Sequence, residues 1–232
     1  MNIALGNRFK KFSYKNNRFL ITIILASVLG LLLLYSKINF NNKRNLIYSK
    51  NLDRVCAVVD GDDLTLRNFA FYVAYEESEV EKKAKVYDSK HPEKYWKLHT
   101  NGQFIKYAAR NATVDMGIHD YFFYKKALKD KVVLTDKEKE VLKNSQEDFW
   151  EDLKDRGGDK LLGVKKKDIY DTMEKVAIAQ KEQYVCEQLD GVDEGDYDFN
   201  QDAYKNLLEK YNYKIVKKVW MRIDFGNVTL KH

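Results

Sequence analysis

The chain has 232 residues, of which 41 are basic and 35 acidic, and its formal net charge at pH 7 is +6. Residues 1–18 hold five basic side chains and no acidic one, and residues 37–54 hold five basic side chains and one acidic one. The remaining residues 55–232 therefore carry a small net negative charge, which does not supply the basic face that nucleic-acid binding requires. With a single proline and 11 glycines, the composition favours long helices over a sandwich of many turns.

Residues 19–36 form one uncharged, apolar run, FLITIILASVLGLLLLYS. As an α-helix, a run of this length spans roughly 27 Å, close to the ~30 Å hydrocarbon core of a bilayer. Because lipid offers no hydrogen-bond partner to the backbone, the run is expected to be one transmembrane helix that binds the chain to the bilayer. A buried core helix is the alternative, but core helices are shorter and rarely lack a polar face.

The flanks of this run predict the organisation of the chain. The acid-free segment 1–18 is typical of a tail retained in the cytoplasm, which places the C-terminal domain outside a single-pass cell membrane protein. No small-x-small cleavage site follows the apolar run, so an uncleaved signal anchor is expected, with signal peptidase cleavage as the alternative. Polar residues 37–53 are interpreted as a juxtamembrane linker, and residues 54–232 as one helical domain.

The first half of this domain combines a strand with helices. Arg54–Asp60 is β-prone and is followed by a turn, and Leu64–Thr65 then opens a helix to about Tyr87 with Thr65 as its N-cap. A short helix follows over Pro92–Leu98. Residues 103–130 carry two apolar stripes at helical spacing, which predicts the central helix of the domain.

The second half is again mainly helical. Leu134–Glu138 contains a capping box that starts a helix to about Asp155. Helices are also expected at 166–189 and 202–211, and a strand at 213–223. The expected fold is mainly α, with two short terminal strands that pair and close the domain.

Catalytic or metal chemistry has little support in the sequence. The four histidines lack metal-ligand spacing, and His119 lies on an apolar stripe as an interior residue, so neither a metal nor a cofactor is expected. Asp196–Asn200 resembles the start of a calcium loop but lacks the required glycine and the final glutamate. Cys56 and Cys186 are interpreted as two packed thiols, although a bridge between them is the alternative.

The aromatic content is high, with 16 Tyr, 12 Phe and 3 Trp. Tyrosine and tryptophan offer broad apolar contact together with a hydrogen-bonding tip, which suits binding of extended polypeptides. For each residue the alternative is packing of helix on helix. The candidate peptide-binding residues are Tyr72, Tyr75, Trp96, Tyr107, Tyr121, Phe122, Tyr124, Phe149 and Trp150.

Three segments together resemble the N-terminal chaperone domain of SurA/PrsA-type foldases. They are the strand, turn and helix start at Val55–Phe69, the turn between helices at Leu134–Glu140, and the glycine-aliphatic step into a long helix at Gly163–Tyr170. The resemblance covers about residues 55–223. It implies a helical domain, related to the C-terminal arms of trigger factor, that holds unfolded segments.

A parvulin prolyl isomerase domain often follows in that family, but only about a dozen residues separate the expected helices 166–189 and 202–211. Gly157–Gly163 is similar to a parvulin loop with two extra residues, and we interpret it as a turn between helices. The sequence thus predicts a non-enzymatic, membrane-anchored chaperone that binds unfolded or secreted polypeptides. The alternative is a dedicated partner-binding subunit of an envelope complex that keeps this fold without general chaperone activity.

Overall fold

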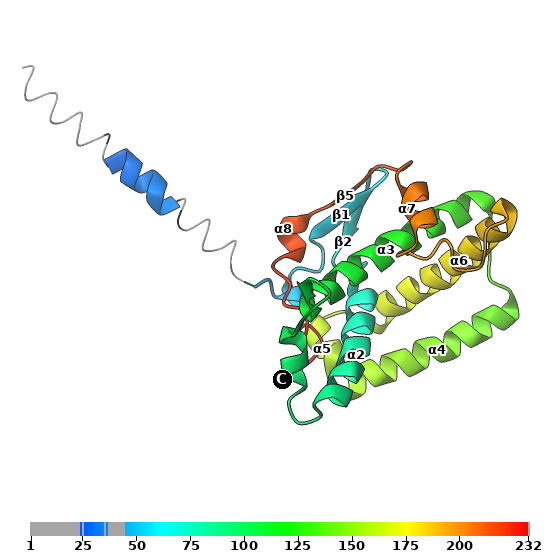
Figure 1. Cartoon of the computed structure of the whole chain (residues 1–232), viewed down its shortest axis with the longest axis horizontal. Coiled ribbons are helices and arrows are strands. Elements are labelled where there is room, and N and C mark those ends of the chain that lie inside the picture. The colour runs from blue at the N-terminus through cyan, green and yellow to red at the C-terminus, as the bar shows by residue number, and fades with distance from the viewer. Residues whose placement is uncertain (1–23, 25, 35, 37–44, 232) are drawn as a thin grey trace, which may run out of the picture. The chain divides into compact units, whose positions relative to one another are not determined.

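A computed structural model describes residues 24, 26–34, 36 and 45–231 of the chain (Figure 1). The chain divides into two compact units, residues 1–44 and residues 45–232. In the first unit the described residues are helical, and the large apolar side chains among them are exposed. No helix among the described residues is both long and apolar enough to cross a membrane. The span expected at 19–36 lies partly outside these residues.

The second unit begins at Asn45, nine residues before the boundary that the sequence analysis gives. Leu46, Tyr48 and Leu52 are all buried in its main core, and Tyr48 opens a short 3-10 helix, η1 (Tyr48–Lys50). The Tyr48 hydroxyl donates a hydrogen bond of 2.5 Å to the backbone oxygen of Leu66. Residues 45–53, which their polar composition assigns to the linker, are therefore part of the domain.

The two ends of the domain meet in a small antiparallel sheet. Its strands are β1 (Val55–Val59), β2 (Asp62–Thr65) and β5 (Tyr213–Ile215), in the order β2-β1-β5. The predicted pairing of an early and a late strand is confirmed, with Val58 opposite Lys214. The late strand is shorter than expected, however, because residues 217–220 form the helix α8 (Lys217–Trp220). Successive residues Val219 and Trp220 are both buried, which an alternating strand with one solvent face does not allow.

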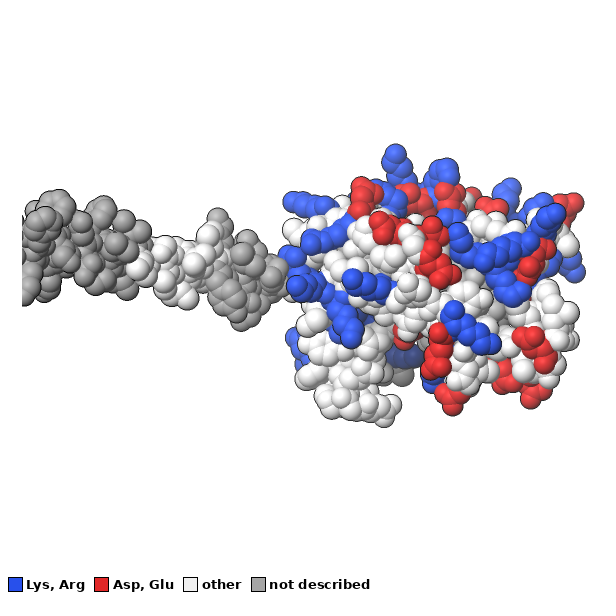
Figure 2. All heavy atoms as spheres, turned by 90° about the horizontal axis from the view of Figure 1, so that it is seen from above, with Lys and Arg blue, Asp and Glu red and all other residues white. Residues whose placement is uncertain are grey.

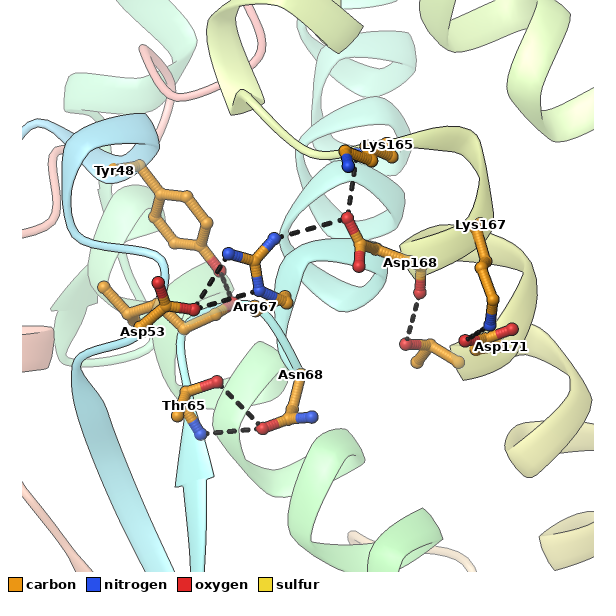
Figure 3. Close-up of polar contacts among 11 residues, drawn as sticks. Tyr48, Asp53, Thr65, Arg67, Asn68, Lys165, Lys167, Asp168 and Asp171 are labelled. Atoms are coloured by element: carbon orange, nitrogen blue, oxygen red, sulfur yellow. Dashed lines mark hydrogen bonds and ion pairs between the residues drawn. The ribbon is translucent and has the colours of Figure 1, made fainter.

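Helix α2 (Ala70–Tyr87) starts later than predicted, and Thr65 is not its N-cap. Thr65 ends strand β2 instead, and its backbone N–H donates to Oδ1 of Asn68 at 2.8 Å (Figure 3). Arg67 then spans two acidic groups, Asp53 at 2.8 Å and Asp168 at 3.3 Å (Figure 3). These contacts hold residues 65–69 in a turn that buries Leu66 and Phe69.

The other predicted helices are confirmed with small changes at their ends. They are η2 (Pro92–Lys97), α3 (Ile105–Asp130), α4 (Asp136–Asp155), α6 (Lys166–Asp190) and α7 (Asp202–Leu208). The capping box at the start of α4 is present, with the Glu138 backbone N–H donating to Oγ1 of Thr135. The predicted turn at 157–163 contains a short helix, α5 (Gly158–Leu162), and the Asn-Gly pair at 101–102 turns a hairpin of β3 (His99–Thr100) and β4 (Gln103–Phe104).

The central position predicted for α3 is confirmed. The helix contacts α2, α6 and η2, and Gly117 on it lets the Phe69 ring approach so closely that a Cβ at this position would overlap the ring. A second, smaller aromatic cluster at the far end of α3 and α6 packs the loop 191–201 and α7 onto the two helices. His119 lies in this cluster as the predicted interior residue, with Nε2 2.9 Å from the backbone oxygen of Tyr197.

A buried carboxylate on α2 holds the C-terminal segment. The side chain of Glu77 is wholly buried, and its Oε1 accepts hydrogen bonds from the backbone N–H groups of Gly226 at 2.6 Å and Val228 at 3.1 Å. Oε2 accepts two more from Thr229, from the backbone N–H at 2.7 Å and from the hydroxyl at 2.6 Å. Four donors thus compensate the loss of hydration of one charge.

Replacing Glu77 by glutamine tests this arrangement in the fragment 45–232. The amide that the substitution introduces would place N–H donors against the N–H donors of the C-terminal segment, so E77Q is expected to lower the free energy of unfolding by about 3 kcal/mol or more. Urea denaturation followed by circular dichroism measures this change. The control is E79Q on the same helix, which removes only a surface pair with Lys82 and should cost at most about 0.5 kcal/mol. If the two substitutions lowered the free energy of unfolding equally, the role of Glu77 in holding the C-terminal segment would be contradicted.

Candidate functional site

A predominantly apolar hollow at the helical surface lies where α2, α4 and α6 meet, and we call it the α4–α6 groove. Its volume is about 410 Å³. Most of its lining is apolar, with Lys and Glu side chains at one end. The lining residues are Phe71, Lys137, Glu138, Val141, Leu142, Ser145, Met173, Val176, Ala177 and Gln180.

The groove is open because α4 is packed into the domain mainly at one end. Leu153, near the C-terminal end of α4, is the residue of this helix that the structure buries, and it contacts the main core. Val141, in the second turn of the helix, is 59% exposed. The ribbon of α4 runs separately from the packed pair α3 and α6 (Figure 1). Exposed apolar surface of this kind makes the groove a candidate interaction site.

Polar contacts hold α4 beside α6 along the edge of the groove. Lys181 on α6 binds Glu138 at 2.7 Å, and Lys166 at the start of α6 binds Glu147 at 2.7 Å. Between them, the side-chain amide of Gln146 donates to the backbone oxygen of Tyr170 at 3.0 Å. These bridges join the two helices along the edge of the groove and leave the space between their apolar faces unfilled.

Aromatic rings form the inner end of the groove. Phe71, on α2, packs against Phe149 of α4 with ring centroids 5.0 Å apart, and it stacks on Tyr75 at 6.0 Å. Two of the nine predicted binding residues, Tyr75 and Phe149, therefore adjoin the groove through Phe71, which the sequence analysis did not select.

The other seven predicted residues lie elsewhere in the domain. Tyr72, Trp96 and Phe122 are buried in the core and have almost no surface to offer a partner. Tyr121 and Tyr124 line a small hollow of about 40 Å³ beside Gly117, too small for a peptide side chain. Tyr121 also lines, with Phe122, a hollow of about 450 Å³ whose other walls carry several Lys and Asp side chains. Trp150 packs partly buried against the main core, and Tyr107 is 40% exposed on the first turns of α3. The structure does not gather the nine residues into one surface.

The residues that do line the groove carried a weaker signal in the sequence. Val141 and Leu142 lie on the single apolar face of α4, and Met173, Val176 and Ala177 lie on the inward face of α6. Helical periodicity identifies each face, but it does not show whether two such faces close on one another. Their identification required the spacing of the two helices.

The two cysteines and the neighbouring pair His119 and Asp120 are buried titratable groups of the domain. Both cysteines are free and buried, as the sequence analysis expects, and burial raises the pKa of the Cys186 thiol to about 12. Nδ1 of His119 lies 2.8 Å from Asp120, and both side chains are buried. Within the described ranges, no group of three or more His, Cys, Asp or Glu side chains is placed to hold a metal ion.

Comparison with known proteins gives no relative for this chain: no family model, curated protein or solved structure matches it. The geometry of the groove and the physical chemistry of its lining therefore carry the functional argument.

The Glu138 bridge gives the groove a pH dependence. Hydrogen bonds from Lys181 and from the Thr135 backbone lower the pKa of Glu138 to about 2, below its usual value near 4.5. Because the folded-state pKa is the lower one, Glu138 stabilises the fold at neutral pH, and this contribution is lost as the pH falls from about 4.5 towards 2. We expect E138Q to be less stable than the wild type at pH 7, with a difference that shrinks through this window.

Urea denaturation of the fragment 45–232 at a series of pH values measures the effect. The matched control is E140Q, an exposed position on the same helix, which should leave the pH dependence of wild-type stability unchanged. If the stability difference between E138Q and wild type stays constant from pH 7 to pH 3, the bridge does not contribute to the pH dependence of stability.

Proposed function

We propose that this chain is a membrane-anchored, extracytoplasmic chaperone-like protein that binds apolar segments of unfolded or secreted polypeptides in the α4–α6 groove. The observation that carries the proposal is the open apolar hollow of about 410 Å³ between α4 and α6. Its size lies at the lower end of the range for ligand sites, which run from about 300 to 1,000 Å³. The sequence resemblance to SurA/PrsA-type chaperone domains and the pairing of the terminal strands support the same interpretation.

The energetics of such a groove favour weak, reversible binding. Each client Leu, Ile, Phe or Met side chain that becomes fully buried contributes about 1.5–3 kcal/mol. Ordering the client and the groove side chains costs about 0.5–1.5 kcal/mol per immobilised side chain, in addition to the loss of translational freedom. A few client side chains therefore give dissociation constants of micromolar order or weaker, which suits a protein that must release its clients.

Membrane anchoring rests on the sequence of residues 1–36. The apolar run 19–36 has the length of a bilayer-spanning helix, and the acid-free tail 1–18 favours retention of the N-terminus on the cytoplasmic side. In this arrangement the domain that begins at Asn45 meets polypeptides as they emerge from the membrane.

An aggregation assay tests client binding with the fragment 45–232, which holds the whole main core of the second unit. Light scattering follows an unfolded test protein as it aggregates, and the wild-type fragment should suppress the signal. V141E places a charge in the groove at an exposed position, so folding should be retained. We expect it to need about tenfold more protein for half-maximal suppression, the equivalent of about 1.4 kcal/mol of lost contact.

The control is V86E, the same substitution at an 89% exposed position on α2 that does not line the groove. V86E should suppress aggregation to the same extent as the wild type. No suppression by a stoichiometric excess of wild-type fragment would refute client binding, and equal activity of V141E and wild type would exclude the groove as its site. Capture of one stoichiometric partner in place of many unrelated clients would identify the chain as a dedicated partner-binding subunit.

A further inference from the structure

A second surface, distant in the fold from the α4–α6 groove, combines exposed aromatic and basic side chains. It consists of the hairpin β3–β4, the first turns of α3 and the helix α8, and we call it the α8 face. Its hairpin, residues 98–105, contains no Asp, Glu, Lys or Arg. Phe104 at the end of the hairpin is 41% exposed and Met221, directly after α8, is 70% exposed.

The side chains of the α8 face form a continuous series. The Phe104 ring packs edge-on against Tyr107 at 5.7 Å, and the guanidinium of Arg110 lies 4.9 Å from the centre of the Tyr107 ring. Nζ of Lys106 lies 5.3 Å from the centre of the same ring. Aromatic rings flanked by cations keep an apolar body and a charged tip on one surface.

A hollow of about 410 Å³ connects this series with α8. It is lined by residues of α3 and of the C-terminal segment, namely Arg110, Asn111, Val114, Asp115, Ile215, Lys217, Trp220 and Met221. Asp115 is the acidic group in this lining, and burial raises its pKa above the usual range. Lys217 and Lys218 are both exposed on α8. The hollow thus continues the aromatic and basic surface from α3 to α8.

The charge distribution distinguishes this end of the domain. Lys and Arg gather at the end of the domain where α8 lies, whereas the rest of that side carries both signs (Figure 2). Since residues 55–232 as a whole have a net negative charge, this local excess of cations is not a consequence of the average composition. A basic surface with exposed Phe, Tyr and Met side chains matches the chemistry of an anionic lipid surface, where aromatic residues and lysines are favoured.

The start of the domain lies on the α8 face. The backbone N–H of Leu46 donates to the backbone oxygen of Arg222 at 2.6 Å, one residue after Met221. Only eight residues separate Ser36, the end of the apolar run, from Asn45. Even fully extended, nine residue steps span roughly 30 Å, so an anchored chain keeps the start of its domain close to the headgroups.

We propose that the α8 face binds the surface of a bilayer that contains anionic phospholipids, and that it orients the domain on the membrane. The inference rests on the membrane anchoring proposed above and extends it from the apolar run to the folded domain. Phe104, Tyr107 and Met221 enter the interfacial region, while Lys106, Arg110, Lys217 and Lys218 contact phosphate groups. Each lysine near such a surface strengthens binding about fivefold, the equivalent of ~1 kcal/mol.

Co-sedimentation of the fragment 45–232 with lipid vesicles tests this proposal without the anchor. Binding to vesicles with about 30% anionic phospholipid should exceed binding to purely zwitterionic vesicles by about tenfold or more, and should weaken as salt is raised. K217E/K218E is expected to lower the partition coefficient by at least about 25-fold, which is the fivefold factor for each of two lysines. K139E/K143E, which makes the same change of net charge at exposed positions on α4, should leave most of the binding intact.

Two results would overturn the proposal: equal binding to anionic and zwitterionic vesicles, or equal loss of binding in the two double variants. Binding of an acidic protein or a nucleic acid in preference to the anionic vesicles would overturn it as well. Suppression of aggregation, measured without lipid, is independent of these results and tests the groove alone. Extraction of the full chain from membranes by alkaline carbonate would refute the apolar anchor, while the vesicle result for the domain would stand.

Discussion

The domain depends on the satisfaction of one buried charge. The carboxylate of Glu77 is wholly buried on α2, and burial raises its pKa while the hydrogen bonds from Thr229, Val228 and Gly226 act against that rise. An uncompensated charge in this position would cost several kcal/mol, so α2 packs in this way only while residues 226–229 remain in place. The last residues of the domain are thereby tied to its first long helix.

The C-terminal part of the domain also contacts the turn before α2 and the sheet. Trp220 on α8 packs edge-on against Phe69 at 5.0 Å, and its indole N–H donates to the backbone oxygen of Cys56 on β1 at 3.0 Å. Strand β5, which precedes α8, pairs with β1. The beginning and the end of the domain thus form one closed unit around α2 and α3, in which most apolar side chains are buried.

Helix α4 is packed less closely than the other long helices. Its partly exposed apolar face forms one wall of the candidate site. It buries Leu153 at one end and is held elsewhere by polar bridges such as Lys181 to Glu138. Surface ion pairs contribute about 0–1 kcal/mol each, far less than a filled core. An element with few buried apolar contacts opens at a lower free energy than the rest of a domain. The groove beside α4 therefore adapts its width more easily than a cavity inside the α2–α3 core.

The sequence predicted the long helices well because local signals specify them. Apolar stripes gave α3 and α6, and the Thr135–Glu138 capping box gave the start of α4. The predicted start of α2 was wrong because Thr65 resembles an N-cap in the sequence. In the structure, Arg67 pairs with Asp53 and Asp168, which lie elsewhere in the chain, and these contacts hold a turn before the helix. Long-range contacts of this kind have no signature in a local window.

The candidate site was harder to predict for a related reason. Aromatic residue type does not separate core from surface, so Tyr72, Trp96 and Phe122 were selected although they are buried. Phe71, next to Tyr72 in the sequence, lines the groove, because adjacent helical positions point about 100° apart. Which of two neighbouring rings faces a groove depends on where the other helices lie, and a single sequence does not encode this in any local pattern.

The separation of the two proposed surfaces follows from the fold. The α4–α6 groove and the α8 face are built from different elements, and the domain places α4 well apart from α8 (Figure 1). A domain that contacts lipid through α8 and its neighbours therefore leaves the α4–α6 groove free of the bilayer surface. Because the closed α2–α3 core connects the two, lipid contact at one surface would orient the other without changing its shape. In this proposal, membrane attachment and client binding depend on separate residues, so that a substitution in one surface is expected to leave the other intact.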